Sequence, residues 1–174
     1  AGKGIDTTDG SANGTIGSLS FSSSLTVQNN TWPSNWTING SFGLAAGNYS
    51  VLGNLIVPSG MSLGTHALNP TGIGAGAGVQ INVTGNITID VGGTVDGIGG
   101  GFFRNKGKGA NCGESQGGGS HGGIGSSTTC LRYGSETRPI GLGSGAAYTV
   151  DSFSVGGGAI KLKSAQNIVV NGII

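Results

Sequence analysis

The segments VLGNLIVPSGMSL (residues 51–63) and VTGNITIDVGGTV (residues 83–95) repeat one pattern of residue types, displaced by 32 positions. Both follow the form V-x-G-N-h-x-h-x-x-G-x-x-h, in which h is an apolar residue. Weaker copies begin at Ile38 and near Gln166. Short strands that repeat between Gly and Asn turns are typical of a β-solenoid, because each turn of the chain buries its apolar face only by stacking on its neighbours.

Strand signals are frequent and short along the rest of the chain, whereas helix signals are almost absent. Gly, Ser, Thr and Asn interrupt every window in which apolar residues could recur at helical spacing. The sequence predicts strands at 17–21, 24–28, 36–44, 49–57, 79–83, 87–91, 159–163 and 168–173. We therefore predict an all-β fold, specifically a parallel β-helix (β-solenoid). A β-sandwich with strand exchange, built from the same strands, is the alternative.

The texture of the sequence changes along the chain. Of the 174 residues, 39 are Gly, and they are densest between Val91 and Gly158. We predict an N-terminal arm at 1–17 and one β-solenoid domain at 18–174. A long Gly-rich insertion, at about 98–158, is expected to leave that domain as ordered loops, because apolar residues are scattered within it.

Charge is unusually scarce. Only 9% of the residues are charged and the formal net charge is +1, against about 25% charged residues in an average protein. Between Asp9 and Asp90 there is no Lys, Arg, Asp or Glu. A near-neutral chain offers no general electrostatic surface for nucleic acid, and no apolar run is long enough to span a membrane, so neither partner is expected.

The charge-poor stretch is rich in Asn-x-Ser/Thr triplets, the acceptor signal for N-glycosylation. Such a Ser- and Asn-rich sequence can also produce idle triplets by chance. We favour a secreted, extracellular or cell-surface chain whose covalent N-glycans hydrate it in place of charge. The acceptors are Asn13, Asn29, Asn35, Asn39, Asn48, Asn82 and Asn86.

Two cysteines, Cys112 and Cys130, fit the same compartment, since an even count in a secreted chain favours a disulfide. An interchain disulfide and a metal site are the alternatives, and the metal site lacks further ligands at close spacing. The chain begins at Ala1 without a signal peptide, as a processed exported chain would, although an artificial boundary would look the same.

The C-terminal half carries GGGSHGG (117–123), YGS (133–135), PIGLGSG (139–145), GGGAIKL (156–162) and IVVNGI (168–173). In this order the motifs resemble the glycine-rich, β-helix-type domains of large extracellular and cell-surface proteins, over residues 79–174. The resemblance implies a secreted, non-enzymatic surface module, and it carries over no catalytic residue.

Candidate catalytic and metal sites are weak, so we expect no enzymatic activity, no cofactor and no bound metal. The seven acids are scattered, and only Asp6 with Asp9, and Asp90 with Asp96, are near one another in sequence. Gly117, Gly119 and Gly122 satisfy G-x-G-x-x-G but lack the strand and helix that a phosphate cradle requires. His121 is expected to serve as a hydrogen-bonding loop residue.

The final strand, at 167–174, is apolar and carries neither charge nor cap. An uncapped strand edge is a template for pairing with another chain, and a contact between unlike ends produces an open filament. We therefore expect a structural subunit that self-assembles head to tail into a filament, sheath or surface fibre. The assembly residues would be Ile168, Val170, Ile173 and Ile174. The alternative is a carbohydrate-binding or adhesive module that uses Trp32 and Trp36.

Overall fold

The computed structural model describes residues 31–32, 34–66, 76–110, 119–121, 132–135, 137, 140–146 and 155–174. Eleven strands and no helix occur within these ranges, which confirms the all-β prediction. The strands are β1 (Thr31–Trp32), β2 (Trp36–Thr37), β3 (Phe42–Ala45), β4 (Gly47–Val51), β5 (Leu55–Val57), β6 (Ser62–His66), β7 (Val79–Val83), β8 (Ile87–Ile89), β9 (Thr94–Val95), β10 (Ile160–Ser164) and β11 (Ile168–Val170).

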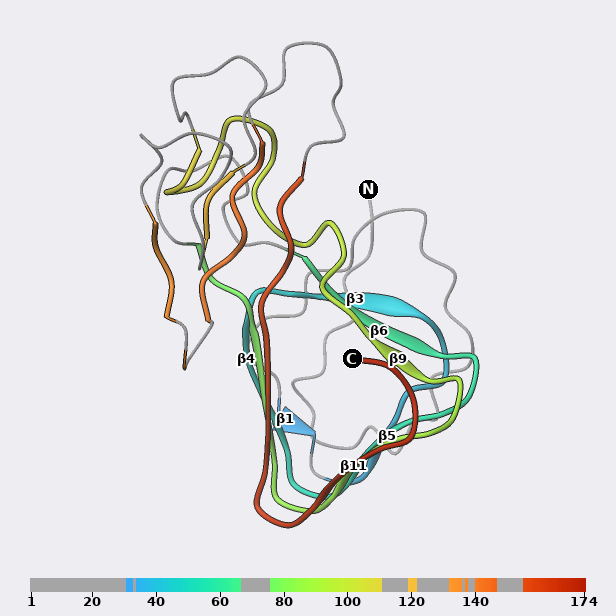
Figure 1. Ribbon diagram of the computed structural model, residues 1–174. Helices are drawn as coiled ribbons and strands as arrows, with labels where there is room; N and C mark the ends of the chain where they lie inside the picture. The colour runs from blue at the N-terminus through green and yellow to red at the C-terminus, as the bar shows by residue number, and fades with distance from the viewer. Residues whose placement is uncertain are drawn as a thin grey trace, which may run out of the picture.

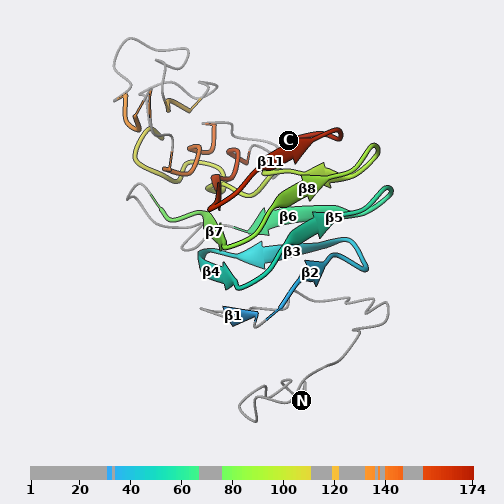
Figure 2. The same cartoon turned by 90° about the horizontal axis from the view of Figure 1, so that it is seen from below.

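The strands form three sheets, with the orders β1-β4-β7-β10 (sheet A), β2-β5-β8-β11 (sheet B) and β3-β6-β9 (sheet C). The chain visits the sheets in turn, in pass 1 (31–45), pass 2 (47–66), pass 3 (79–95) and pass 4 (160–173). Figure 1 looks along the stack, where the sheets enclose a triangle, and Figure 2 shows the passes one above another. The described strand pairs are all parallel, unlike those of a β-sandwich. The arrangement is compatible with the predicted solenoid.

The strand register confirms the principal repeat. Val83 pairs with Val51, Ile87 with Leu55, and Val95 with Leu63, so the two copies lie side by side in the order that the sequence pattern predicted. The copy near Gln166 is also confirmed, because Ile168 pairs with Ile87 and Val170 with Ile89.

The weaker copy at Ile38 was placed in the wrong register. The pattern aligned Ile38 with Val51, but Trp36 pairs with Leu55 and the N–H of Ile38 donates to the carbonyl of Ile56 at 2.9 Å. Ile38 therefore lies opposite Val57, in sheet B. The error arose because apolar residues alternate with the same period in every strand, so one pass offers several frames that fit the pattern equally well.

Two predicted strands were wrong as single elements. The chain turns a corner within 36–44 and within 49–57, so each divides into two strands on different sheets. The corner between sheets A and B takes three residues in every pass: 33–35, 52–54, 84–86 and 165–167. The corner between sheets C and A varies, from Ala46 alone to 67–78 and then 96–159. Most of the irregularity in the spacing of the repeats therefore lies at this corner. The corner between sheets B and C adds a small part, because partners in passes 1 and 2 are 19 positions apart in sheet B (Trp36 and Leu55) and 21 apart in sheet C (Phe42 and Leu63).

The interior of the stack is filled by one apolar row from each strand. In pass 3 the inward residues are Ile81, Val83, Ile87 and Ile89, each at most 3% exposed. Their counterparts in pass 2 are equally buried: Tyr49, Val51, Leu55 and Val57. Each fully buried side chain of this size stabilises the fold by about 1.5–3 kcal/mol, so the stacking of passes supplies most of the hydrophobic driving force.

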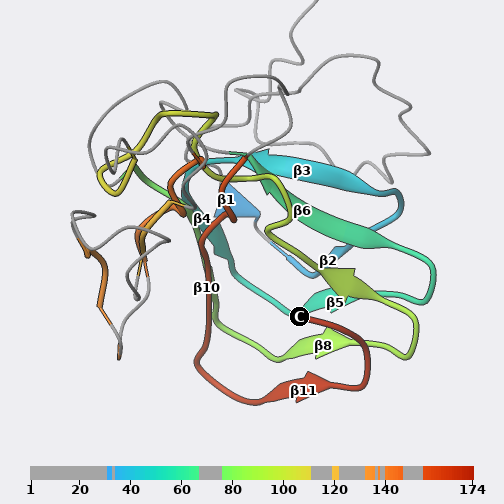
Figure 3. The same ribbon diagram turned by 45° about the horizontal axis from the view of Figure 1, so that its top comes forward.

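The segment between β9 and β10 leaves the stack at the variable corner, where Figure 3 shows it beside the start of sheet A. Its described residues, which we call the Gly-rich unit, include a small cluster of Phe102, Leu142 and Ala159. Backbones approach closely there: a Cβ added to Gly156 would lie 1.9 Å from the carbonyl oxygen of Gly143. Only Gly permits that separation, which explains why Gly stands at position 156.

Candidate functional site

The outer edge of pass 4 is the most exposed apolar surface of the stack. Within the described part of the chain, β10 pairs only with β7 and β11 only with β8, so the far side of both strands has no neighbour. We call this surface the pass-4 edge. Its exposed apolar residues are Ile168 (47% exposed), Val169 (43%), Val170 (45%), Ile173 (64%) and Ile174 (66%).

Register explains this exposure. Ile168 and Val170 continue the inward rows that Ile87 and Ile89 occupy one pass earlier, where both side chains are 0% exposed. The difference arises because pass 3 is covered by pass 4, whereas nothing among the described residues covers pass 4. At the opposite end of the stack, Ile38 of pass 1 is 0% exposed. The two ends are therefore unlike.

The structure brings the predicted assembly residues together. Ile168 and Val170 belong to β11, and Ile173 bridges to Thr94 at the end of sheet C, so all three lie along one edge. Ile174 follows directly and is exposed. Val169 was not predicted. It points to the outer face of sheet B, because its partner Thr88 lies between the buried Ile87 and Ile89.

A ladder of asparagine side chains runs along the corner between sheets A and B. The Oδ1 of Asn35 accepts the backbone N–H of Asn54 at 2.8 Å and its Nδ2–H at 3.1 Å. Asn54 in turn accepts from Asn86, at 2.7 and 3.4 Å. Asn86 accepts from Asn167, at 3.2 Å for both bonds. The ladder has a polarity, since every pass donates to the pass before it.

The ladder was missed by sequence reasoning, although the shared Gly-Asn pair of the repeat was its signal. Gly53 and Gly85 make room for it, because a Cβ at Gly85 would lie 2.4 Å from the Oδ1 of Asn54. Two ladder members, Asn35 and Asn86, also stand in glycosylation triplets. Their amides are therefore engaged in holding neighbouring passes together.

The other described glycosylation candidates point away from the stack. Asn39 is exposed at a corner, and Asn48 is exposed on the outer face of sheet A, next to the buried Tyr49. Asn82 is half-buried on the same face, where its Oδ1 accepts a long 3.5 Å bond from the Nε2 of Gln80. Asn13 and Asn29 lie outside the described residues, as do Cys112 and Cys130.

Trp36 is half-buried. It packs against the main core and its ring lies 6.0 Å from that of Phe42, at an interplanar angle of 36°. It shares the inward register of Leu55, which is fully buried. The side chain of Trp32 lies outside the described part.

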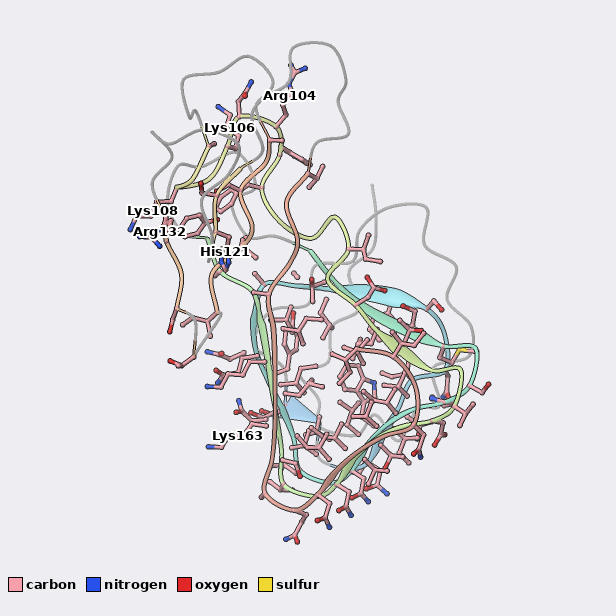
Figure 4. All side chains as sticks on the ribbon, in the orientation of Figure 1. Arg104, Lys106, Lys108, His121, Arg132 and Lys163 are labelled. Carbon is pink, nitrogen blue, oxygen red and sulfur yellow. The ribbon has the colours of Figure 1, made fainter. Side chains whose placement is uncertain are left out.

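Basic side chains gather on one side of the molecule. Figure 4 shows Arg104, Lys106, Lys108 and Arg132 on the Gly-rich unit, and Lys163 projecting from sheet A. On the outer face of sheet A, Lys161 pairs with Gln80, which pairs in turn with Asn48 on the next strand. Lys163, Asn82 and Ser50 form a second row in the same way. This face therefore presents amide, hydroxyl and ammonium groups in rows that cross the strands.

Polar groups of the Gly-rich unit are engaged with one another. The Tyr133 hydroxyl donates to the carbonyl of Leu142 and accepts from Ser144 Oγ at 2.9 Å, and burial raises the pKa of Tyr133 above its ordinary value. His121 Nε2 lies 3.0 Å from the carbonyl oxygen of Gly141, and its ring meets that of Tyr133 edge-on at 4.8 Å. His121 is thus a hydrogen-bonding loop residue, as expected.

In the described ranges, no three His, Cys, Asp or Glu side chains are grouped so that they could hold a metal ion. Asp96 accepts from Ser62 Oγ at 3.1 Å and from the N–H of Ile98 at 3.0 Å, so it closes a turn. No helix long and apolar enough to cross a membrane occurs in the part of the chain that the structure describes.

Comparison of the chain with protein-family models, with curated proteins and with solved structures found no match.

Proposed function

We propose that the chain is a three-sided parallel β-helix that serves as a secreted, N-glycosylated structural subunit, and that copies join head to tail into an extracellular filament or sheath. The observation that carries the proposal is the pass-4 edge. Contiguous exposed apolar surface marks an interaction site, and an unpaired parallel strand offers backbone groups to a further strand. Both features lie on the same edge.

The unlike ends of the stack favour an open polymer. Ile38 is buried at the pass-1 end, while Ile168 and Val170 are half-exposed at the pass-4 end, so the two ends do not present the same surface. A contact between different surfaces is heterologous, and it propagates as a filament unless the rotation closes a ring.

Glycans on outward asparagines fit such a polymer. Asn39 and Asn48 are exposed and lie on the sides of the stack, not on the pass-4 edge. Sugar attached there leaves the edge free to pair. It also hydrates a surface that has few charged groups, because the described residues of passes 1 and 2 include no Lys, Arg, Asp or Glu.

The test is assembly of the purified chain as concentration rises, followed by light scattering and electron microscopy. We expect filaments, and we expect Val170→Asp to suppress them because a buried charge is costly to desolvate. Val91→Asp is the matched control, since Val91 is 73% exposed at a corner away from the pass-4 edge. A chain that stays monomeric at every concentration would contradict the proposal.

A second candidate function is a carbohydrate-binding or adhesive surface module, favoured by the outer face of sheet A. Strands lie about 4.8 Å apart there, so the row of Asn48, Gln80 and Lys161 presents hydrogen-bonding groups at regular intervals. This candidate predicts saturable glycan binding that Gln80→Ala and Lys161→Ala weaken together. Glycan binding unaffected by both substitutions, or none at all, would rule out this face.

A further inference from the structure

Positive charge gathers along one path on the surface, which we call the basic track. It consists of the described Lys and Arg residues, and Figure 4 shows its upper part on the Gly-rich unit and Lys163 on sheet A below. Its members are Arg104, Lys106, Lys108 and Arg132 on the Gly-rich unit, and Lys161 and Lys163 on β10. Each of these side chains is exposed or half-buried, so all of them are accessible to a partner.

Strand β10 directs both of its lysines outward. Ile160 and Leu162 pack against the main core, and side chains alternate between the two faces of a strand, so Lys161 and Lys163 project from the outer face of sheet A. Their Cα atoms are about 7 Å apart. Gln80 pairs with Lys161 on the neighbouring strand. The two ammonium groups therefore stand beside carboxamides, and no aromatic side chain points outward from β4, β7 or β10.

Backbone hydrogen bonds hold two further cations close together on the Gly-rich unit. Segment 119–121 bonds to residue 109 at 3.0 Å and to residue 133 at 3.2 Å. It therefore lies between the segments that carry Lys108 and Arg132, both of which are exposed.

The two parts of the basic track are joined through the backbone. Ala159 ends the Gly-rich unit, and its carbonyl accepts the N–H of Val79 at 2.8 Å, at the start of sheet A. Lys161 follows two positions later. Figure 3 shows the Gly-rich unit beside this end of the sheet. A long ligand can therefore contact the cations of the unit and those of β10 together.

The described carboxylates do not neutralise the basic track. The strands of sheet A contain none, and the described part of the Gly-rich unit contains only Asp96, at its first position. Asp96 is already engaged with Ser62 Oγ and with the N–H of Ile98. Asp90, the other described acid, follows β8 at the corner between sheets B and C. A cationic surface of this kind attracts an anionic partner.

We infer that the basic track binds an acidic polysaccharide, a glycan chain that carries carboxylate or sulfate groups. The inference rests on the second candidate function and names the class of glycan. The ammonium and guanidinium groups pair with the anionic groups, while the neighbouring Gln80 and Asn82 exchange hydrogen bonds with sugar hydroxyls. Proteins that bind single-stranded nucleic acid stack its bases on aromatic side chains, which the outer face of the described sheet A strands lacks.

The site does not compete with the proposed filament. Lys161 and Lys163 project from the face of sheet A, whereas a further strand would pair with the backbone of β10 in the plane of the sheet. The glycan proposed at Asn48 lies two strands away from β10. Each copy in a filament presents its own basic track, so a long acidic polymer that contacts several copies gains avidity.

The first test compares polymers that share a backbone and differ in charge. Dilute protein is titrated with dextran sulfate and with unmodified dextran, and polygalacturonate and duplex DNA serve as further probes. We expect saturable binding to an acidic glycan at least about tenfold tighter than to dextran, and weaker binding as salt rises from about 0.05 to about 0.2 M. A preference between dextran sulfate and polygalacturonate identifies sulfate or carboxylate as the recognised group.

Three outcomes of this titration contradict the inference. Equal affinity for dextran and dextran sulfate overturns it but leaves the second candidate function standing. Tighter binding of DNA than of either acidic glycan overturns it in favour of a nucleic-acid surface. Binding to no glycan at all overturns both the inference and the second candidate function, while assembly into filaments is measured separately.

The second test locates the site. We expect the double variant Lys161→Gln with Lys163→Gln to weaken binding of dextran sulfate at least about fivefold, and Lys161→Arg with Lys163→Arg to stay within about twofold of the parent chain. The matched control is Val91→Asp with Asn171→Asp, which lowers the net charge equally at exposed corner positions away from the basic track. It should also stay within about twofold. Equal weakening in the control and the glutamine variant overturns the inference, because net charge alone would then explain binding.

Discussion

The backbone N–H of Asn86 donates to the side-chain Oδ1 of Asn54 at 2.7 Å, although 32 positions separate the two residues in the sequence. The same bond recurs one pass earlier, from Asn54 to Asn35, and one pass later, from Asn167 to Asn86. The side-chain amides thus satisfy backbone donors at a corner where the sheets leave them unpaired. The ladder links all four passes in register.

Removing one member of this ladder should destabilise the stack. Asn54→Ala leaves the half-buried N–H of Asn86 without its acceptor and removes the side-chain donor to Asn35, while the backbone N–H of residue 54 still donates to Asn35. We expect the free energy of unfolding to fall by about 2 kcal/mol, measured by urea titration of dilute protein. Asn171→Ala is the control, since Asn171 is exposed and lies outside the ladder, and it should cost less than about 0.5 kcal/mol. Equal losses would contradict a stabilising ladder.

Truncating an inward side chain should cost more stability in pass 3, which pass 4 covers, than in pass 4 itself. Ile89 is 0% exposed, while Val170, its partner one pass later, is 45% exposed. Ile89→Ala is expected to lower the free energy of unfolding of the dilute chain by about 3 kcal/mol, because it removes packed volume. Val170→Ala should lower it by less than about 1 kcal/mol. Thermal unfolding of both variants checks this, and a larger loss for Val170→Ala would mean that the pass-4 edge is covered in the isolated chain.

Adjacent glycines of the Gly-rich unit should differ sharply in tolerance. A Cβ on Gly156 would lie 1.9 Å from the backbone oxygen of Gly143, whereas one on Gly157 meets nothing within 4 Å. Gly156→Ala is therefore expected to open this unit, at a cost of about 3 kcal/mol, and Gly157→Ala to be near neutral. Amide hydrogen exchange at Phe102 and Gly143 reports the difference. Similar protection in both variants would refute the close backbone contact.

Stability should decline at alkaline pH because two phenols are buried. Burial raises the pKa of Tyr49 and Tyr133, so folding favours their neutral forms. Their contribution is complete below pH about 10, the ordinary tyrosine value, and is lost as the pH rises through the higher pKa of the folded state. Tyr49→Phe should cost about 1 kcal/mol at neutral pH, since it removes the 2.7 Å bond to the Ala45 carbonyl.

The same variant should also show a shallower loss of stability between pH 10 and pH 12 than the parent chain. Urea unfolding at several pH values, together with phenolate absorbance, measures both quantities. An identical alkaline decline in the two proteins would show that Tyr49 titrates as it does in the unfolded chain.

Glycan occupancy should follow the position of each asparagine. Asn39 and Asn48 are exposed on the sides of the stack, whereas the Nδ2 of Asn86 is a ladder donor at 3.4 Å and its side chain is half-buried. We expect glycopeptide mass spectrometry of native protein to find sugar at Asn39 and Asn48, and a much lower occupancy at Asn86. Full occupancy at Asn86 would mean that the sugar is attached before the ladder forms.

Much of the fold was predictable, because strands and their repeats depend on the order of apolar and polar residues within short stretches of sequence. The predicted strand 79–83 coincides with β7, and the repeat at 51–63 and 83–95 specifies the true pairing of passes 2 and 3. The sequence also indicated Ile168 and Val170 as residues of an exposed strand edge, because the final strand is apolar and carries no charge. These features depend on neighbours within a few positions.

Tertiary structure alone decided where the chain turns and what the asparagines do. Apolar and polar residues alternate through 36–44 as they would in one strand, yet β2 and β3 lie on different sheets. The chain turns at 38–41 because each of the two strands pairs with a different strand of pass 2, β2 with β5 and β3 with β6. Likewise, Asn86 has the same sequence signature whether it carries a sugar or joins a ladder. Its role depends on Asn54 lying one strand away. Local patterns thus determined the strands of this protein, while contacts between passes determined the corners, the register of pass 1 and the ladder, since those contacts join residues 19 to 81 positions apart.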